Sequence, residues 1–230
     1  MAEDTSFGNI FDLSIKTLKS KGKLLFSLFI VLGIPSFIVN LYSNLRPLRL
    51  DSPDLPFRFL NFSMFSILST LVAMLAVTSA LYVLFKSPRE TSLLGAIKGG
   101  LKYYLRYLLF FIIVVFLTTL LSIFFVIPGI VYMVNRIFSM FIIVDQDATV
   151  GESFKKSKQL VKGNWWRTLG KLLLLYIILY GIGFIFIVIF SFFGVVLSSI
   201  ISSLVFTIIS VITVVFLANL YNVQKYKSRK

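Results

Sequence analysis

Asn135 and Arg136 are a polar and a charged residue inside an apolar stretch. Arg136 is the only charged residue between positions 129 and 144. A charged side chain within a bilayer costs at least about 2.5–3.5 kcal/mol on insertion scales, so it needs a partner or a purpose. Two interpretations stay open. The guanidinium holds an anionic group such as a lipid phosphate or a partner carboxylate, or it snorkels or pairs internally because this span is short and tilted.

Asp145 and Asp147 flank Gln146 just beyond this stretch. Two carboxylates at this spacing could hold Mg²⁺ together with a substrate phosphate. The alternative, which we expect, is a solvated turn that begins an amphipathic helix with Thr149 as its N-cap. Asp145 follows Arg136 by nine residues, about 13 Å along a helix, so the two cannot pair within one straight helix. No metal site and no cofactor are expected.

A basic segment that ends in two tryptophans follows. Indole rings favour the headgroup layer of a membrane, so anchoring explains the pair Trp165-Trp166. The neighbouring cations could also recognise anionic lipid heads, each contributing about 1 kcal/mol near a charged surface. The candidate lipid-binding residues of this segment are Lys155, Lys156, Lys162, Trp165, Trp166 and Arg167.

Catalytic side chains are scarce. The chain has no cysteine and no histidine, and only nine acidic residues. Disulfides, thiolate or imidazole metal ligands and histidine acid–base catalysis are therefore excluded. Without a buried pair of acids, hydrolysis also lacks its usual groups. We expect no catalytic residues and no enzymatic activity.

Apolar residues make up 58% of the 230 residues, and the mean hydropathy is +0.94. Soluble domains are nearer 45–50% apolar. Crossing about 30 Å of hydrocarbon takes about 20 apolar residues in a helix, and six runs approach or exceed this length. The sequence therefore predicts an all-α integral membrane protein that forms one membrane domain, residues 1–230. The predicted spans are Leu24–Leu45, Phe62–Phe85, Leu105–Ile127, Gly129–Val144, Leu172–Phe190 and Val195–Tyr221.

The formal net charge of +14 follows the membrane boundaries. Basic residues gather in the N-terminal segment, in the links between spans two and three and between spans four and five, and in the tail. The opposite side has only Arg46, Arg49 and Arg58. The positive-inside rule then places both termini in the cytoplasm. Orientation accounts for the charge, so we expect no nucleic-acid partner.

Three amphipathic stretches precede the three predicted pairs of spans, which suggests a threefold repeat with units 1–87, 88–147 and 148–230. Apolar residues recur at helical spacing in each stretch, so each is expected to form an interfacial helix, separated from its span by a polar or glycine break. The stripes are Phe7, Ile10, Phe11, Ser14, Ile15 and Leu18; Leu94, Ile97, Leu101, Tyr104 and Leu105; and Val150, Phe154, Ser157 and Val161. The predicted turns between spans are Pro128-Gly129 in the second unit and Phe193-Gly194 in the third.

Pro128-Gly129, Arg136, Asp145 and the segment Lys162-Gly163-Asn164-Trp165 form a longer pattern. It resembles the membrane domain attached to some bacterial glycerophosphodiester phosphodiesterases, and the related stand-alone YciC-like membrane proteins. The resemblance covers about residues 127–170. That family often has a proline after the arginine and a glutamate as the acid, whereas this sequence has neither. The soluble phosphodiesterase domain is not in this sequence, so its activity does not follow.

The resemblance implies a membrane module of a bacterial cytoplasmic membrane, connected with lipids. Our first hypothesis is a non-enzymatic module that binds anionic membrane phospholipid or acts as a membrane scaffold. A transporter or channel for a small solute or lipid is the second, and a water-filled path to Arg136 from both faces would favour it. An accessory subunit that docks a protein partner is the third. The sequence names no partner and no oligomeric state.

Overall fold

The computed structural model describes residues 6–45, 55–87 and 91–227, and all regular secondary structure in these ranges is helical. Six segments are long and apolar enough to cross a membrane. The chain is therefore a multi-pass helical membrane protein. Arg46 and Arg49 lie outside the described residues. The helices are α1 (Phe7–Leu45), α2 (Leu55–Phe85), α3 (Leu93–Phe124), α4 (Val126–Arg136), α5 (Ser139–Asp145), α6 (Val150–Val161), α7 (Trp165–Ser191) and α8 (Val195–Lys227).

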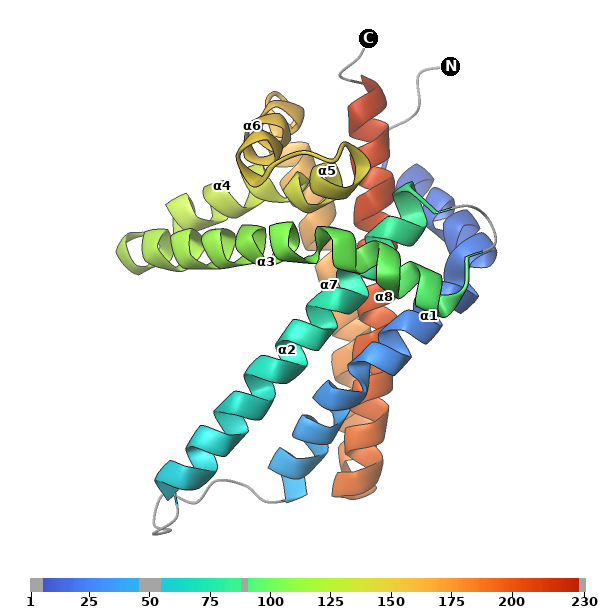
Figure 1. The fold of residues 1–230 in the computed structure, drawn as a ribbon, viewed down its shortest axis with the longest axis vertical. Helices are drawn as coiled ribbons and strands as arrows, with labels where there is room; N and C mark the ends of the chain where they lie inside the picture. The colour runs from blue at the N-terminus through green and yellow to red at the C-terminus, as the bar shows by residue number, and fades with distance from the viewer. Residues whose placement is uncertain (1–5, 46–54, 88–90, 228–230) are drawn as a thin grey trace.

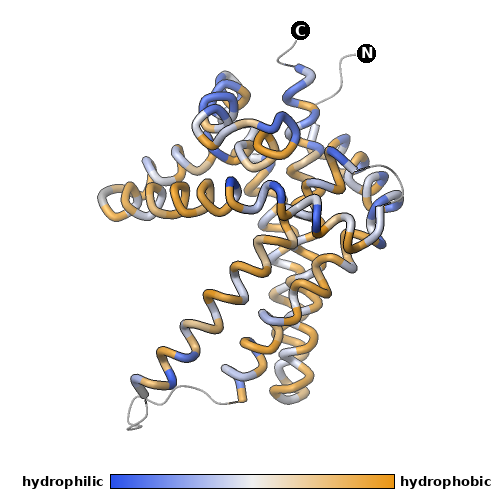
Figure 2. The backbone as a smooth tube through the Cα atoms, viewed as in Figure 1, coloured by the Kyte–Doolittle hydropathy of each residue, from blue (hydrophilic) through white to orange (hydrophobic). Residues whose placement is uncertain are grey.

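Four helices, α1, α2, α7 and α8, extend along the long axis of the molecule, whereas α3 and α4 form a hairpin that runs across it (Figure 1). The short helices α5 and α6 lie beyond this hairpin, near the end of the molecule at which α1 begins and α8 ends. We call this the terminal end. Hydrophilic residues gather there, whereas the long helices and the hairpin are mainly hydrophobic (Figure 2).

The first predicted boundary is wrong, because α1 continues through Lys21-Gly22-Lys23 without a break. A glycine inside a helix costs only about 1 kcal/mol relative to alanine, and Gly22 is buried where the helix packs. The Lys21 ammonium donates to the Val83 carbonyl near the end of α2 at 2.5 Å. Cations favour the C-terminal end of a helix, so this lysine stabilises the contact of α1 with α2.

The second interfacial helix is also not separate, since α3 runs unbroken through the predicted stretch and span. In the second predicted stripe, Leu94, Leu101 and Leu105 are exposed, while the neighbouring residues Ala96 and Gly100 are buried. A Cβ atom on Gly100 would lie 2.6 Å from the backbone of Ser79 in α2. Small residues thus face the neighbouring helix, and the large apolar side chains face outward.

The predicted turn at Pro128-Gly129 is displaced, because the chain reverses at Phe125 and both residues lie inside α4. Proline is favoured in the first turn of a helix, where its missing N–H is not needed. Gly129 permits close packing of the hairpin, since a Cβ atom there would lie 2.0 Å from Ser122 Oγ on α3.

The fourth predicted span, Gly129–Val144, is not one helix. It breaks at Ile137 and Phe138 into α4 and the seven-residue α5. The side chains of Phe141, Ile142, Ile143 and Val144 are all fully buried. Neighbouring helices therefore surround α5 on every side, which explains why a buried helix can read as part of a span in the sequence.

The third unit matches its prediction. Thr149 caps α6 and forms a capping box with Glu152. The helix is followed by Gly163, whose φ of +81° suits glycine. Val150, Ser157 and Val161 of the third stripe are buried. The turn at Gly194 is likewise confirmed, and its φ is +95°. The division of the whole chain into repeats stays a prediction.

Candidate functional site

Arg136 is the last residue of α4, and its guanidinium lies against α6. It donates to the Phe154 carbonyl oxygen. The guanidinium carbon lies 4.9 Å from the centre of the Phe154 ring and 5.3 Å from that of Tyr132. Cation–π contacts of this kind are worth about 0.5–2 kcal/mol. Arg136 therefore joins α4 to α6 through a carbonyl and two aromatic rings.

Among the described residues, no carboxylate lies within ion-pair distance of Arg136. Its Nε atom is buried without a hydrogen-bond partner. Asn135, the preceding residue, accepts a hydrogen bond at its backbone oxygen from Ser157 Oγ at 2.8 Å. Both predicted residues thus contact α6, and anion binding at Arg136 stays a prediction.

Asp145 pairs with α8 instead. Its carboxylate forms an ion pair with Lys225 and accepts a hydrogen bond from the Tyr221 hydroxyl at 2.7 Å. Both charged side chains are mostly buried, with exposed fractions of 17% for Asp145 and 19% for Lys225. Gln146 donates to the same hydroxyl at 3.1 Å and accepts from Lys156 at 2.8 Å. These hydrogen bonds join the loop after α5 to α6 and α8.

Asp147 faces a different pair of helices. Its two carboxylate oxygens accept from Lys86 and from the Tyr103 hydroxyl, both at 2.7 Å. The Lys86 ammonium and then the Tyr103 hydroxyl lower the pKa of the Asp147 carboxyl below its usual value. Its φ of +52° is tolerated by aspartate better than by most residues.

The two carboxylates of the Asp-x-Asp segment therefore point to separate partners, Lys225 and Lys86. Within the described ranges, no three potential metal ligands of the His, Cys, Asp and Glu types converge. A metal held jointly by Asp145 and Asp147 would have to displace both lysines. The arrangement is that of a structural turn with Thr149 as the next N-cap.

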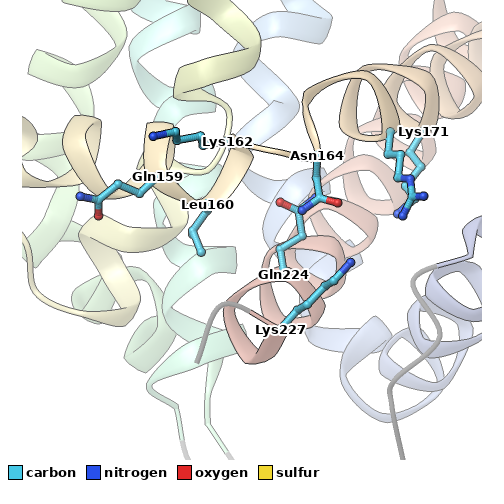
Figure 3. A pocket seen from close by; sticks show the side chains of 8 residues that line it. Gln159, Leu160, Lys162, Asn164, Lys171, Gln224 and Lys227 are labelled. Carbon is cyan, nitrogen blue, oxygen red and sulfur yellow. The ribbon is translucent and has the colours of Figure 1, made fainter. Parts of the chain in front are cut away.

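The basic residues of the predicted lipid-binding segment separate into two groups. Lys155 and Lys156 lie on the exposed side of α6. Lys162 and Arg167, by contrast, line a cavity of about 190 Å³ between the end of α6, the start of α7 and the end of α8 (Figure 3). We call this cavity the basic pocket. Its described lining residues are Gln159, Leu160, Lys162, Asn164, Arg167, Lys171, Gln224 and Lys227.

Four of these eight residues are basic and none is acidic. The first turn of α7 adds to the positive potential, since the N-terminal end of a helix attracts anions. Asn164, the N-cap of α7, makes no side-chain capping hydrogen bond. Its amide lies beside that of Gln224 at the pocket (Figure 3).

Gln224 supplies a buried polar group at this wall. Its side chain is only 6% exposed, and its Nε2 donates to Thr168 Oγ1 at 2.9 Å. Its Oε1 atom is buried without a hydrogen-bond partner. Rotating the amide by 180° lets Thr168 donate to Oε1 and turns the two N–H donors of Nε2 to the unpartnered side.

The tryptophans lie at the start of α7 beside the pocket. Trp166 is 78% exposed, and its ring packs edge-on against Trp165 with ring centres 4.7 Å apart. An exposed indole on a membrane helix suits the headgroup layer. Trp166, a predicted anchor, is thus adjacent on α7 to Arg167, which lines the basic pocket.

Sequence reasoning found Lys162 and Arg167 but not the other lining residues. Lys171 lies one helical turn after Arg167, so its position on the same face could have been inferred. Gln224 and Lys227 are more than fifty residues further along the chain. Their spacing of three places them on one face of α8, but only the packing of α7 on α8 brings that face to α6.

A second cavity, of about 600 Å³, lies among α1, α2, α7 and α8 in the middle of the bundle. Its lining is mainly apolar, with hydroxyls from residues such as Tyr176, Ser203 and Thr207. Arg136 lines neither this cavity nor the basic pocket. The path to Arg136 that the transport hypothesis needs is therefore not formed by either cavity.

Comparisons with protein-family models, with curated proteins and with solved structures found no match for this chain. The resemblance to the phosphodiesterase-linked membrane domain and to YciC-like proteins therefore stays an expectation from the motif. Its own residues therefore carry the evidence for what the protein does.

Proposed function

We propose that this multi-pass membrane protein is a non-enzymatic module that binds the headgroup phosphate of an anionic phospholipid in the basic pocket. The observation that carries the proposal is the charge of the pocket: four basic and no acidic residues among the described residues that line the cavity. Phosphate is the group that such a set of donors recognises best.

Arg167 and Lys162 have complementary roles in this proposal. A guanidinium can donate two parallel hydrogen bonds to phosphate oxygens, whereas an ammonium acts as a compact point charge. Lys227 approaches from the end of α8 on the opposite wall. The pocket volume of about 190 Å³ suits a phosphate and part of its headgroup, so the acyl chains would stay in the bilayer.

The location of the pocket supports a lipid as the source of the phosphate. Trp166 is exposed next to the pocket, and tryptophan prefers the depth of the headgroups. The apolar part of α7 begins six residues further on, at Leu172. A ligand in the basic pocket would therefore lie level with the surface of the bilayer.

Native mass spectrometry from nanodiscs that contain phosphatidylglycerol and phosphatidylcholine tests the proposal. The pocket variant is Lys162→Gln/Arg167→Gln, and the control is Lys155→Gln/Lys158→Gln, which removes two exposed charges from the same region. We expect wild type and control to retain phosphatidylglycerol. The pocket variant should retain at least about tenfold less of it. That factor corresponds to about 1.4 kcal/mol.

Four outcomes would contradict the proposal. Equal losses in both double variants would show that diffuse surface charge attracts the lipid. Retention by the pocket variant, or no retention by wild type, would leave the pocket without a lipid ligand. Loss from a folded Arg136→Leu variant alone would move the site to α4. Adding inorganic phosphate to the wild type separates the lipid from the free anion, since a site for free phosphate would release phosphatidylglycerol.

A further inference from the structure

The α3–α4 hairpin departs most from a bundle of parallel spans, because it crosses the long helices instead of running along them (Figure 1). α3 crosses α2 where Gly99 and Gly100 meet Tyr82 and Ser79. Beyond this crossing, the hairpin extends away from α1, α2, α7 and α8. Its direction differs from that of every helix in the four-helix bundle.

The hairpin carries no charge over most of its length. Residues 107–135 contain no aspartate, glutamate, lysine or arginine. The structure describes the burial of residues 111–123 and 125–133, and among them only Gly129 is buried. The exposed fractions are 64% for Phe116, 73% for Ile123 and 74% for Ile127. Apolar surface of this extent is not left in water by a folded protein.

The exposure is spread over both helices of the hairpin. A surface helix that lies in the headgroup layer has one charged face, and here no such face exists. A protein partner would cover one side of the hairpin, whereas a fluid hydrocarbon phase covers all sides. Helices satisfy their own backbone hydrogen bonds between their ends, and the N–H of Phe125 at the turn donates to the Leu121 carbonyl at 3.1 Å. The hairpin can therefore be immersed in hydrocarbon in any direction.

The crossing point sets the depth of the hairpin. Ser79 lies six residues before Phe85, the last residue of α2, which is about 9 Å along the helix. One leaflet contributes about 15 Å of hydrocarbon. The hairpin therefore lies within the leaflet on the side of the terminal end. Charged residues at its base, among them Arg106 and Arg136, lie close to Asp147 and α6 at that end.

We propose that the α3–α4 hairpin does not cross the membrane but is embedded in the leaflet on the side of the terminal end, with the acyl chains of that leaflet around it. The bundle then has four membrane-crossing helices, α1, α2, α7 and α8, and both chain termini stay on one side. The hairpin adds volume to one leaflet alone, so it acts as a wedge in that leaflet.

The chain contains no cysteine, so single cysteines can be introduced directly. Phe125→Cys places a thiol at the tip of the hairpin, Phe57→Cys marks the opposite end of α2, and Lys158→Cys marks α6. A membrane-impermeant maleimide is applied to intact cells and to inside-out membrane vesicles. We expect the reagent to label Phe57→Cys from one side, Lys158→Cys from the other, and Phe125→Cys at less than a tenth of either level from both sides.

Labelling of Phe125→Cys from the side of Phe57→Cys would show that the hairpin crosses the membrane and would overturn the proposal. Labelling from the side of Lys158→Cys would place the tip in water and would also overturn it. Phe125→Cys unfolded in a denaturing detergent must react fully, because neither the bilayer nor the folded protein then covers the thiol. This control shows that the thiol itself is reactive.

A second measurement identifies what covers the tip. A fluorophore attached at residue 125 after solubilisation is reconstituted with lipids that carry a spin label on an acyl chain. We expect quenching equal to that of a probe at Ile177→Cys, an exposed position in the apolar part of α7. Weak quenching at the tip, or a disulfide-linked dimer of Phe125→Cys, would show that a second copy covers it and would contradict the proposal.

Discussion

The Tyr221 hydroxyl joins α8 to the end of α5 and the residue that follows it. The side chain is fully buried, and its ring packs against Phe85, Phe138 and Phe141 with ring centres 5.8–6.0 Å apart. A phenol in such a setting needs a hydrogen-bond partner. Here the hydroxyl donates to Asp145 at 2.7 Å and accepts from Gln146 at 3.1 Å. The ring therefore fixes the position of the loop that follows α5.

Tyr221→Phe removes this hydroxyl and leaves the ring in place. Since a hydrogen bond to a charged group contributes about 1.5–3 kcal/mol, we expect a loss of about that size in the free energy of unfolding. Tyr226→Phe is the matched control, because Tyr226 lies on the same helix and is 61% exposed. Denaturant titration in detergent micelles measures both. Equal stability of the two variants would show that the hydroxyl contributes nothing.

The polar residues discussed above show which contacts could be predicted from the sequence and which could not. The sequence indicated that Asp145 could not pair with Arg136 along one helix, and the structure agrees, but its partner Lys225 is eighty residues away. Likewise, Lys162 and Arg167 were predictable as candidates from their local charge. Gln224 and Lys227 were not predictable, because only helix packing brings α8 close to Lys162 and Arg167.

At the scale of elements, close approach of α3 to α2 depends on two glycines. A Cβ atom on Gly100 would lie 2.4 Å from Ser79 Oγ and 2.6 Å from its backbone. The Ser79 side chain is fully buried and cannot move far. Small residues at helix crossings allow backbones to approach in membrane proteins, so the direction of the hairpin depends on these positions.

Gly100→Ala should force α3 away from α2. Overpacking of this kind costs about 1–3 kcal/mol, and we expect a loss of stability in that range in micelles. Gly170→Ala in α7 is the control, because a Cβ atom there meets nothing within 4 Å. Alanine is favoured over glycine in a helix by about 0.5–1 kcal/mol, so this control should be as stable as wild type or more so. A harmless Gly100→Ala substitution would contradict the close-packing account.

Apolar length alone predicted that the elements are helices, but not how two of them are directed. The runs at Leu105–Ile127 and Gly129–Val144 have the composition of spans, and hydropathy does not distinguish a crossing helix from one that lies within a leaflet. Residues of the second amphipathic stretch face two different surroundings. Large apolar side chains such as Leu105 can face lipid in a membrane, whereas small residues such as Gly100 face protein.

At the scale of the whole molecule, the first and last helices pack along each other. Near the terminal end, Asn219 of α8 donates to Ser14 and Thr17 of α1, each at 3.3 Å. Near the opposite end, Asn44 of α1 donates to Ser199 of α8 at 3.0 Å. These hydrogen bonds join the last helix to the first near both ends of their contact, and α1 begins and α8 ends at the terminal end (Figure 1).

Replacing these amides by leucine tests whether they hold the α1–α8 contact. Interhelical hydrogen bonds in membranes contribute about 0.6 kcal/mol on average and up to about 1.7. We expect Asn219→Leu to lose more stability than Asn44→Leu, because Asn219 is less exposed and bonds to two hydroxyls. The two sites are twenty residues apart on α8, about 30 Å, so the losses should add within about 0.5 kcal/mol in the double variant. Unfolding in micelles measures all three variants. Unchanged stability in the double variant would show that apolar packing alone joins the first helix to the last.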